Sequence, residues 1–253
     1  MKVIFHEDFY NVYESDPAAA AGRLEPIVRK ILDDPFYQLI EPVPAKKEDI
    51  LRVHTERHFQ RIQSDAYVFL MAMLAAGGAI QAADIAYTEK TATFGLIRPP
   101  GHHASRDSCW GFCFFNNIAV SLLYLMQKYP IHSAFILDFD LHTGDGNINI
   151  LEGYRDVYIL NPYSHDEIKY VREIEEKLLS LKNVDIFICS AGFDNAQGDW
   201  GGVLSTESYH KIGMLLKKYS QKLCEGRRYA LLEGGYNYSL MPTNFDGFCK
   251  GFG

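Results

Sequence analysis

The sequence predicts an α/β fold, a central parallel sheet with helices on both faces. Short apolar runs of the strand type alternate with longer segments in which apolar residues recur at the helical period, as at Ile168, Val171, Ile174 and Leu178. Such alternation is typical of βαβ units, whose strands run parallel. No repeat, low-complexity region or domain boundary interrupts it, so we expect residues 1–253 to form a single domain.

The first part of the chain is predicted to be mainly helical. A short strand at 3–6 opens it, and the proline-rich stretch that follows indicates a loop with one helix near 24–32. Two short helices at 47–53 and 56–63 precede an alanine-rich segment at 66–86. The most apolar part of that segment is shorter than a membrane span and contains two adjacent glycines, which favours a buried helix.

Strands and helices alternate more regularly in the rest of the chain. Asn116 is suited to cap a helix that runs to about residue 128. The helical period recurs at 167–181 and again at 206–223. Short apolar runs predict strands at 93–99, 134–137, 157–160, 186–193 and 229–232.

Composition argues against several classes of function. Lys and Arg number 25 against 32 Asp and Glu, and a net charge of −7 without a basic run argues against nucleic-acid binding. The five cysteines are an odd number without regular spacing, which indicates reduced thiols and not a disulfide framework. The N-terminus lacks a hydrophobic signal core, so we expect a cytoplasmic protein without a membrane partner.

Groups able to bind a metal or transfer protons follow four of the predicted strands. They are His102-His103 after 93–99, Asp138 to His142 after 134–137, Asp194 after 186–193, and Glu233 to Tyr236 after 229–232. The carboxyl ends of parallel strands form one rim, and ligands bind just outside that rim. We therefore expect the four clusters to meet at one active site.

Residues 138–142 hold the strongest candidate metal ligands. In an extended segment alternate side chains share a face, so Asp138, Asp140 and His142 are expected to point the same way. A catalytic zinc takes three protein ligands and leaves one position open, and Asp194 is the natural partner of Asp140 and His142. The same donor set also suits Fe²⁺. A helix cap or a surface turn is the alternative interpretation of such a short motif.

Further side chains at this rim suit proton transfer. Histidine as a residue type titrates near neutrality, which suits His102 and His103 to acid–base work, and Asp138 and Asp145 are acceptors that could orient them. A tandem histidine also occurs in ordinary surface loops, so the pair alone is a weak indication. Tyr236 follows two glycines at a strand end, where its hydroxyl could donate to a developing oxyanion or simply pack.

At this point five motifs resemble those of the zinc-dependent histone deacetylase superfamily. That superfamily includes acetylpolyamine amidohydrolases and acetoin-utilisation proteins and shares the arginase-like α/β fold. The motifs, in the family's order, are RPPGHHA (98–104), GFCFFNN (111–117), LDFDLHTGDG (137–146), SAGFD (190–194) and LEGGYN (232–237). The resemblance extends from His6 to Tyr236, and it departs at Thr143, where many members have a second histidine.

The resemblance implies a role for each matching residue. The implied set comprises the zinc ligands Asp140, His142 and Asp194, the pairs His102–Asp138 and His103–Asp145, Tyr236 as the group that polarises the amide carbonyl, Gly111, Phe112 and Gly235 as substrate contacts, and Arg23 and Cys113 as supporting residues behind them. Zn²⁺ is the implied cofactor, and many members hold a K⁺ near the positions of Asp138 and Asp140.

The implied activity is hydrolysis of an acetyl or other short acyl group from an amine such as acetyl-lysine, an acetylpolyamine or a small N-acetyl metabolite. The segment 162–184 is shorter than usual in the family, which predicts a wider and shallower pocket. The wider pocket leaves histone-tail specificity unsupported, and the absence of a Glu between Asp199 and Leu204, where a gatekeeping acid marks some polyamine deacetylases, leaves a polyamine preference open. An arginase-like binuclear manganese ureohydrolase and a non-catalytic module that binds acetylated amines are the alternatives. The oligomeric state stays open.

Overall fold

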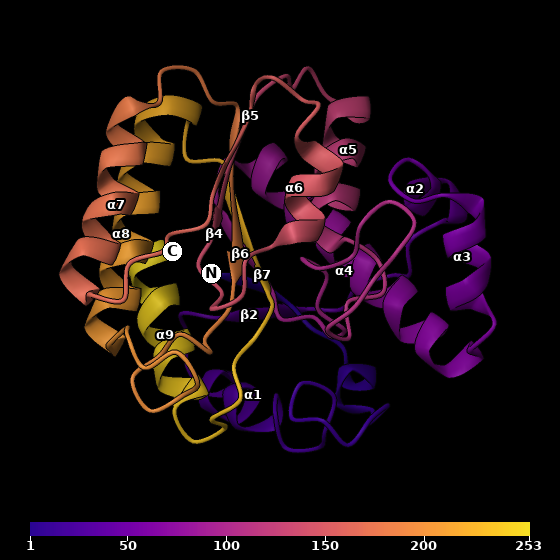
Figure 1. Ribbon diagram of the computed structural model, residues 1–253. Coiled ribbons are helices and arrows are strands. Elements are labelled where there is room, and N and C mark those ends of the chain that lie inside the picture. Colours follow the sequence, from indigo (N-terminus) through magenta and orange to yellow (C-terminus); the bar gives the residue numbers. More distant parts are fainter.

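A seven-stranded sheet forms the centre of the protein, as the computed structural model of residues 1–253 shows (Figure 1). The strands are β1 (Lys2–Ile4), β2 (Gln38–Ile40), β3 (Ala92–Gly95), β4 (Ala134–Asp138), β5 (Val157–Leu160), β6 (Ile186–Ala191) and β7 (Arg228–Leu232). They lie in the order β2-β1-β3-β7-β6-β4-β5, and every neighbouring pair is parallel. The predicted α/β fold with a central parallel sheet is confirmed.

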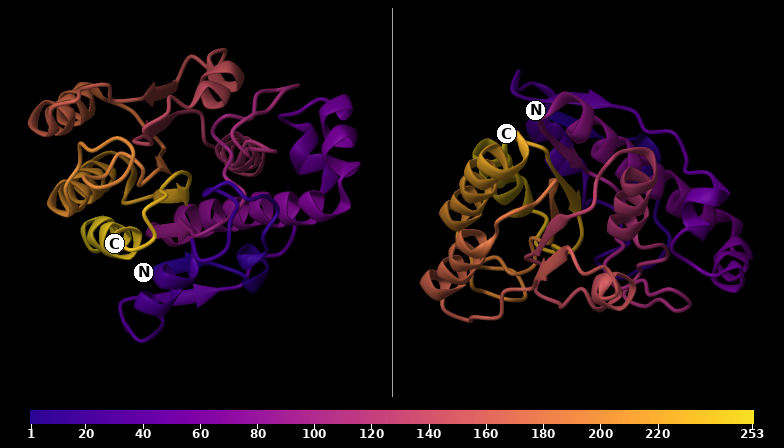
Figure 2. Two further views of the ribbon diagram at one scale, coloured as in Figure 1. Left: turned by 60° about the horizontal axis from the view of Figure 1, so that its bottom comes forward. Right: turned by 90° about the horizontal axis from the view of Figure 1, so that it is seen from above.

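Helices cover both faces of the sheet (Figures 1 and 2). One face carries α7 (Glu167–Ser180), α8 (Thr206–Cys224) and α9 (Met241–Phe252), and the other carries α4 (Ala66–Glu89), α5 (Asn117–Lys128) and α6 (Asp145–Leu151). The remaining helices are the 3₁₀ helix η1 (Glu7–Tyr10), α1 (Glu25–Leu32), α2 (Lys47–Leu51) and α3 (Glu56–Gln63). Because both faces are covered, the four strands β3, β4, β6 and β7 are entirely buried.

The helix α4 is longer than the sequence indicated. Asp65 caps its start by accepting the backbone N–H groups of Tyr67 and Val68, and a left-handed residue, Lys90, ends it. Its length and composition would allow it to cross a membrane, but 67% of its most apolar stretch is buried within the protein. It packs against β1, β3 and β7, so it is a core helix, as its alanine content predicts.

Four elements were not predicted: η1, β2, α6 and α9. The strand β2 is short, lies at the sheet edge and is only partly buried, so it has no apolar run. The helices α6 and α9 contain glycine, asparagine or proline, which have low helix propensity and therefore hide the helical period. The predicted strand at 93–99 ends at Gly95, which leaves residues 96–103 as the loop that enters the rim.

Candidate active site

The four strands that carry the reactive clusters are consecutive in the sheet, in the order β3-β7-β6-β4. Their carboxyl ends therefore meet at the centre of one rim, as the sequence analysis expects. A cavity of about 140 Å³ opens there. Its lining includes His102, His103, Gly111, Phe112, His142 and Tyr236.

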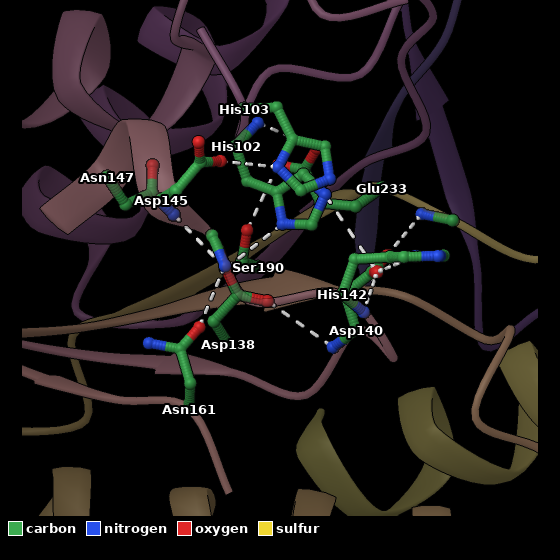
Figure 3. Close-up of polar contacts among 12 residues, drawn as sticks. His102, His103, Asp138, Asp140, His142, Asp145, Asn147, Asn161, Ser190 and Glu233 are labelled. Atoms are coloured by element: carbon green, nitrogen blue, oxygen red, sulfur yellow. Dashed lines mark hydrogen bonds and ion pairs between the residues drawn. The ribbon is translucent and has the colours of Figure 1, made fainter. Parts of the chain in front are cut away.

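Three donor groups converge on one side of this cavity. The Nδ1 atom of His142 lies 3.3 Å from Asp140 Oδ1 (Figure 3). The same atom lies 3.1 Å from Asp194 Oδ2. Donor atoms of all three residues lie within 4.8 Å of one another. Strand β4 ends at Asp138, so Asp140 and His142 occupy a bend and not an extended segment, yet both side chains still reach Asp194.

The electrostatics of this group fit a divalent cation. The carboxylates of Asp140 and Asp194 are buried, and neither pairs with a lysine or an arginine. Burial and the charge of Asp140 raise the pKa of Asp194 to about 7, and hydrogen bonds to the two carboxylates raise the pKa of His142 to about 10. Two buried carboxylates without a lysine or arginine partner are costly, and two Asp with one His are ordinary zinc donors.

Backbone groups hold the two carboxylates in place. The N–H of Gly234 donates to Asp140 Oδ2 at 2.7 Å, and the N–H of Leu141 donates to Asp194 Oδ1 at 3.0 Å. A Cβ atom at position 234 would lie 2.6 Å from an oxygen of each carboxylate. Glycine is therefore required at 234 for the end of β7 to approach the donor group.

His102 is enclosed by acceptors at the base of the cavity. Its Nδ1 lies 3.2 Å from Asp138 Oδ2, which also accepts a hydrogen bond from Asn147 Nδ2 at 3.3 Å (Figure 3). Burial alone would lower the pKa of His102, but the carboxylates of Asp140 and Asp138 outweigh it and raise that pKa well above the usual value. His102 is therefore expected to carry a proton and a positive charge.

His103 lies in a different environment. Its Nδ1 is 2.6 Å from Asp145 Oδ1, and Asp145 is the first residue of α6 (Figure 3). Burial and the neighbouring charge of His102 lower the pKa of His103 to about 4. The imidazole is neutral at pH 7, and with Nδ1–H directed at Asp145 the Nε2 lone pair is free to accept a proton.

Glu233 connects three strand ends, a role that the sequence analysis did not assign. Its Oε2 accepts the backbone N–H groups of Gly101 at 2.7 Å and His102 at 3.1 Å. Its Oε1 accepts the hydroxyl of Ser190 at 3.0 Å (Figure 3). The buried carboxylate therefore fixes the loop that carries both histidines. An acidic residue directly after a fully apolar strand was the available signal.

Tyr236 lies in the cavity lining and is held from two sides. Asp199 Oδ2 accepts the backbone N–H of Tyr236 at 2.8 Å and that of Asn237 at 2.7 Å. The indole of Trp200 packs on the phenol with ring centroids 4.0 Å apart. Burial and the charges of Asp140 and Asp194 raise the pKa of Tyr236, so its hydroxyl remains a proton donor at neutral pH.

The remaining expected residues divide between the lining and the layer behind it. Gly111 and Phe112 line the cavity. Arg23 lies behind, where its Nε donates to the carbonyl of Gly235 at 2.9 Å and its Nη2 donates to that of Glu233. Gly235 thus faces Arg23, and its neighbour Gly234 takes the place in the lining.

Cys113 is also behind the lining. It is buried, and its sulfur lies within 4.8 Å of donor atoms of His102 and Glu233.

Residues 18–173 match the histone deacetylase domain, and the chain belongs to that family of deacetylases. The crystal structure of the HDA15 HD domain has the same fold, with a TM-score of 0.86 over 99% of this chain and 90% of that one at 24% identity.

Three relatives match this chain over different shares of their own length. A probable deacetylase of Archaeoglobus fulgidus is 29% identical, over 93% of this chain and 81% of that protein. A probable deacetylase of Methanothermobacter thermautotrophicus is 34% identical, over 63% of this chain and 53% of that protein. The human polyamine deacetylase HDAC10 is 29% identical over 74% of this chain, which corresponds to 34% of its own length.

Proposed function

We propose that this chain is a cytoplasmic zinc-dependent amidohydrolase that removes an acetyl or other short acyl group from an amine. The observation that carries the proposal is the meeting of two kinds of groups in one cavity. The donors Asp140, His142 and Asp194 lie within 4.8 Å of one another with His142 in the cavity lining, and the neutral imidazole of His103 and the phenol of Tyr236 line the same cavity. Amide hydrolysis needs an electrophile, a base and an oxyanion donor, and these groups can supply all three.

The zinc would be held by Asp140, His142 and Asp194, and when bound it would lower the pKa of a water molecule and polarise the acyl carbonyl. His103 accepts the proton of the attacking water at Nε2 and later delivers a proton to the leaving amine. Asp145 keeps the Nδ1–H of His103 in place during both transfers.

The other groups stabilise the developing negative charge or contact the substrate. His102, protonated, places a positive charge beside the reacting centre. Tyr236 donates its hydroxyl hydrogen to the carbonyl oxygen as negative charge builds on it. The carbonyl of Gly111 accepts the N–H of the scissile amide, and Phe112 lines the approach. The carbonyl of Gly235 accepts a hydrogen bond from Arg23 Nε, which holds the turn that carries Tyr236.

A binuclear manganese ureohydrolase is less well supported by the same contacts. Such a centre needs further carboxylates that bridge two metals. The nearby acids are already engaged: Asp138 Oδ2 by His102 and Asn147, and Glu233 Oε2 by the N–H groups of Gly101 and His102. We propose instead that Asp138 and Asp140 border a K⁺ site.

A panel of acylated amines, with acetate release as the measurement, identifies the substrate class. HDAC10 is named a polyamine deacetylase, and relatives of several organisms are named histone deacetylases, so both acyl-lysine peptides and acetylated polyamines are included, together with small N-acetyl amines. The protein is stripped of metal and reloaded with Zn²⁺ or Fe²⁺. We expect acetate release by reloaded protein only. A chain that binds neither metal stoichiometrically would overturn the proposal.

A further inference from the structure

Trp110 forms a closed group with His103 and Asp145. The indole ring lies over the imidazole of His103, with ring centroids 3.7 Å apart and an angle of 28° between the planes. Its Nε1–H donates to Asp145 Oδ2 at 2.9 Å, while Asp145 Oδ1 receives the Nδ1–H of His103 at 2.6 Å. One carboxylate is thus shared between the imidazole and the indole that covers it.

The backbone is shaped to bring Trp110 to this position. Gly111 and Phe112 both have a φ of +60°, and the N–H of Cys113 closes the turn on the carbonyl of Trp110 at 3.1 Å. Two successive left-handed residues are rare, and for Phe112 the conformation is strained. A Cβ atom at position 111 would lie 2.8 Å from His103 Cδ2, so the turn presses directly against the same imidazole.

The carboxylate of Asp145 is exposed enough to require a second hydrogen-bond partner such as the indole of Trp110. Its side chain is 42% exposed, in contrast to Asp138 at 0%, so water can compete for its oxygens. A carboxylate that is free to rotate would present either oxygen to His103 and would let the imidazole tilt. The indole N–H occupies one oxygen and leaves the other for Nδ1, and its ring shields one face of the imidazole from solvent.

We propose that Trp110 is a positioning residue that fixes the Asp145 carboxylate and, through it, the orientation and tautomer of His103. The proposal rests on the role of His103 as the base in the proposed function. The proposal explains why a tryptophan occupies a half-exposed position. Trp110 is 53% exposed, so it buries little apolar surface, but its indole contacts both His103 and Asp145.

The first experiment tests the contact without any assay of activity. The chain has two tryptophans, and the indole N–H of Trp200 has no hydrogen-bond partner within the protein, so it serves as an internal reference. In ¹⁵N-labelled, metal-free protein we expect the Trp110 indole N–H to exchange with solvent more slowly than that of Trp200. Asp145→Ala should shift the Trp110 signal and bring its exchange to the Trp200 rate. Equal exchange of the two signals in the unchanged chain would overturn the proposal.

The second experiment separates the hydrogen bond from the packing. Trp110→Phe keeps an aromatic face on His103 and removes only the N–H donor. We expect about 10-fold lower kcat on the best substrate, with KM and the affinity for a hydroxamate unchanged, because only the orientation of the base is lost. In metal-free protein the ¹⁵N signals of the His103 ring should show mixed tautomers.

Tyr163→Phe, at an aromatic residue that is 81% exposed and outside the site, is the matched control and should leave every readout unchanged. A Trp110→Phe variant with unchanged kcat and a single His103 tautomer would overturn the proposal. If the variant failed to fold, the exchange comparison in the unchanged chain and in Asp145→Ala would decide. If no substrate were turned over, the proposed function would fail while the tautomer measurement still tested the role of Trp110.

Discussion

The carboxylate of Asp199 holds the backbone of Tyr236, accepting its N–H at 2.8 Å. The same oxygen accepts the N–H of Asn237, so a single side chain fixes the turn that presents the phenol. Asp199→Ala should lower the free energy of unfolding by about 1 kcal/mol, because two partly buried N–H donors lose their acceptor. It should also lower kcat through misplacement of the phenol. In the double variant with Tyr236→Phe the two losses in kcat should not add, and additive losses would show that Asp199 acts elsewhere.

Tyr236→Phe isolates the hydroxyl, since the ring and its packing on Trp200 remain. Loss of one oxyanion donor costs about 10²–10³ in kcat, with a smaller effect on KM. A hydroxamate, which binds without being hydrolysed, should retain its affinity. Hydrolysis at the unchanged rate by this variant would remove Tyr236 from the mechanism and leave the metal site as it is.

The tandem histidines should differ in consequence, because the neighbouring carboxylates raise the pKa of His102 well above its usual value, whereas burial and the charge of His102 lower the pKa of His103 to about 4. His103→Ala should reduce kcat by about 10²–10⁴-fold while the metal content stays unchanged. His102→Ala should cost less. Steady-state kinetics together with metal analysis of both variants tests this. Near-normal turnover by His103→Ala would require a different base.

Metal binding should depend on Asp194 beyond its contribution to packing. Asp194→Asn keeps the size and the acceptor for the Leu141 N–H but removes one negative charge. We expect stoichiometric Zn²⁺ in the unchanged chain and a large loss of affinity in the variant, measured by competition with a chelator. The metal-free variant should be at least as stable as the metal-free parent, since a buried like-charge contact with Asp140 is relieved. Equal zinc affinity of the two proteins would contradict the assigned donor set.

Stability should fall below neutral pH because of His54. Its Nε2 accepts the Asn116 N–H at 2.9 Å while its Nδ1 lies 3.0 Å from the Ser105 carbonyl, so the ring must be neutral. Burial and His58 lower the pKa of His54 to about 3. With an unfolded value near 6.5, the unfolded state binds the proton first, and about 2–3 kcal/mol is lost between pH 6.5 and roughly 4.5.

Urea unfolding of metal-free protein across this range measures the effect. His54→Gln should flatten the dependence on pH, whereas the exposed His165→Gln should leave it unchanged. An unaltered slope in His54→Gln would assign the titration to other groups.

The sequence predicted the parallel sheet and the rim at which its clusters meet, because fully buried strands leave unbroken apolar runs and strand ends leave polar residues. Asp140, His142 and Asp194 could be grouped in this way across more than fifty residues of chain. The contact of Trp110 with Asp145 could not be predicted. It depends on two successive left-handed residues, and a glycine–phenylalanine pair does not indicate that conformation. The roles of Glu233 and Asp199 could not be predicted for a related reason: their partners include backbone N–H groups, which every residue except proline carries.

The place of β7 in the sheet has a consequence for how the protein is made. One half of the sheet, β2-β1-β3, carries the tandem histidines, and the other half, β6-β4-β5, carries the metal-binding donors; β7 alone joins them. It is also the last of the seven strands of this sheet to be synthesised. Until residues 228–232 are synthesised, the nascent chain has two ribbons with open edges, each a template for aggregation. Catalytic competence is therefore expected to arise in one late step of translation, when a single strand closes both edges.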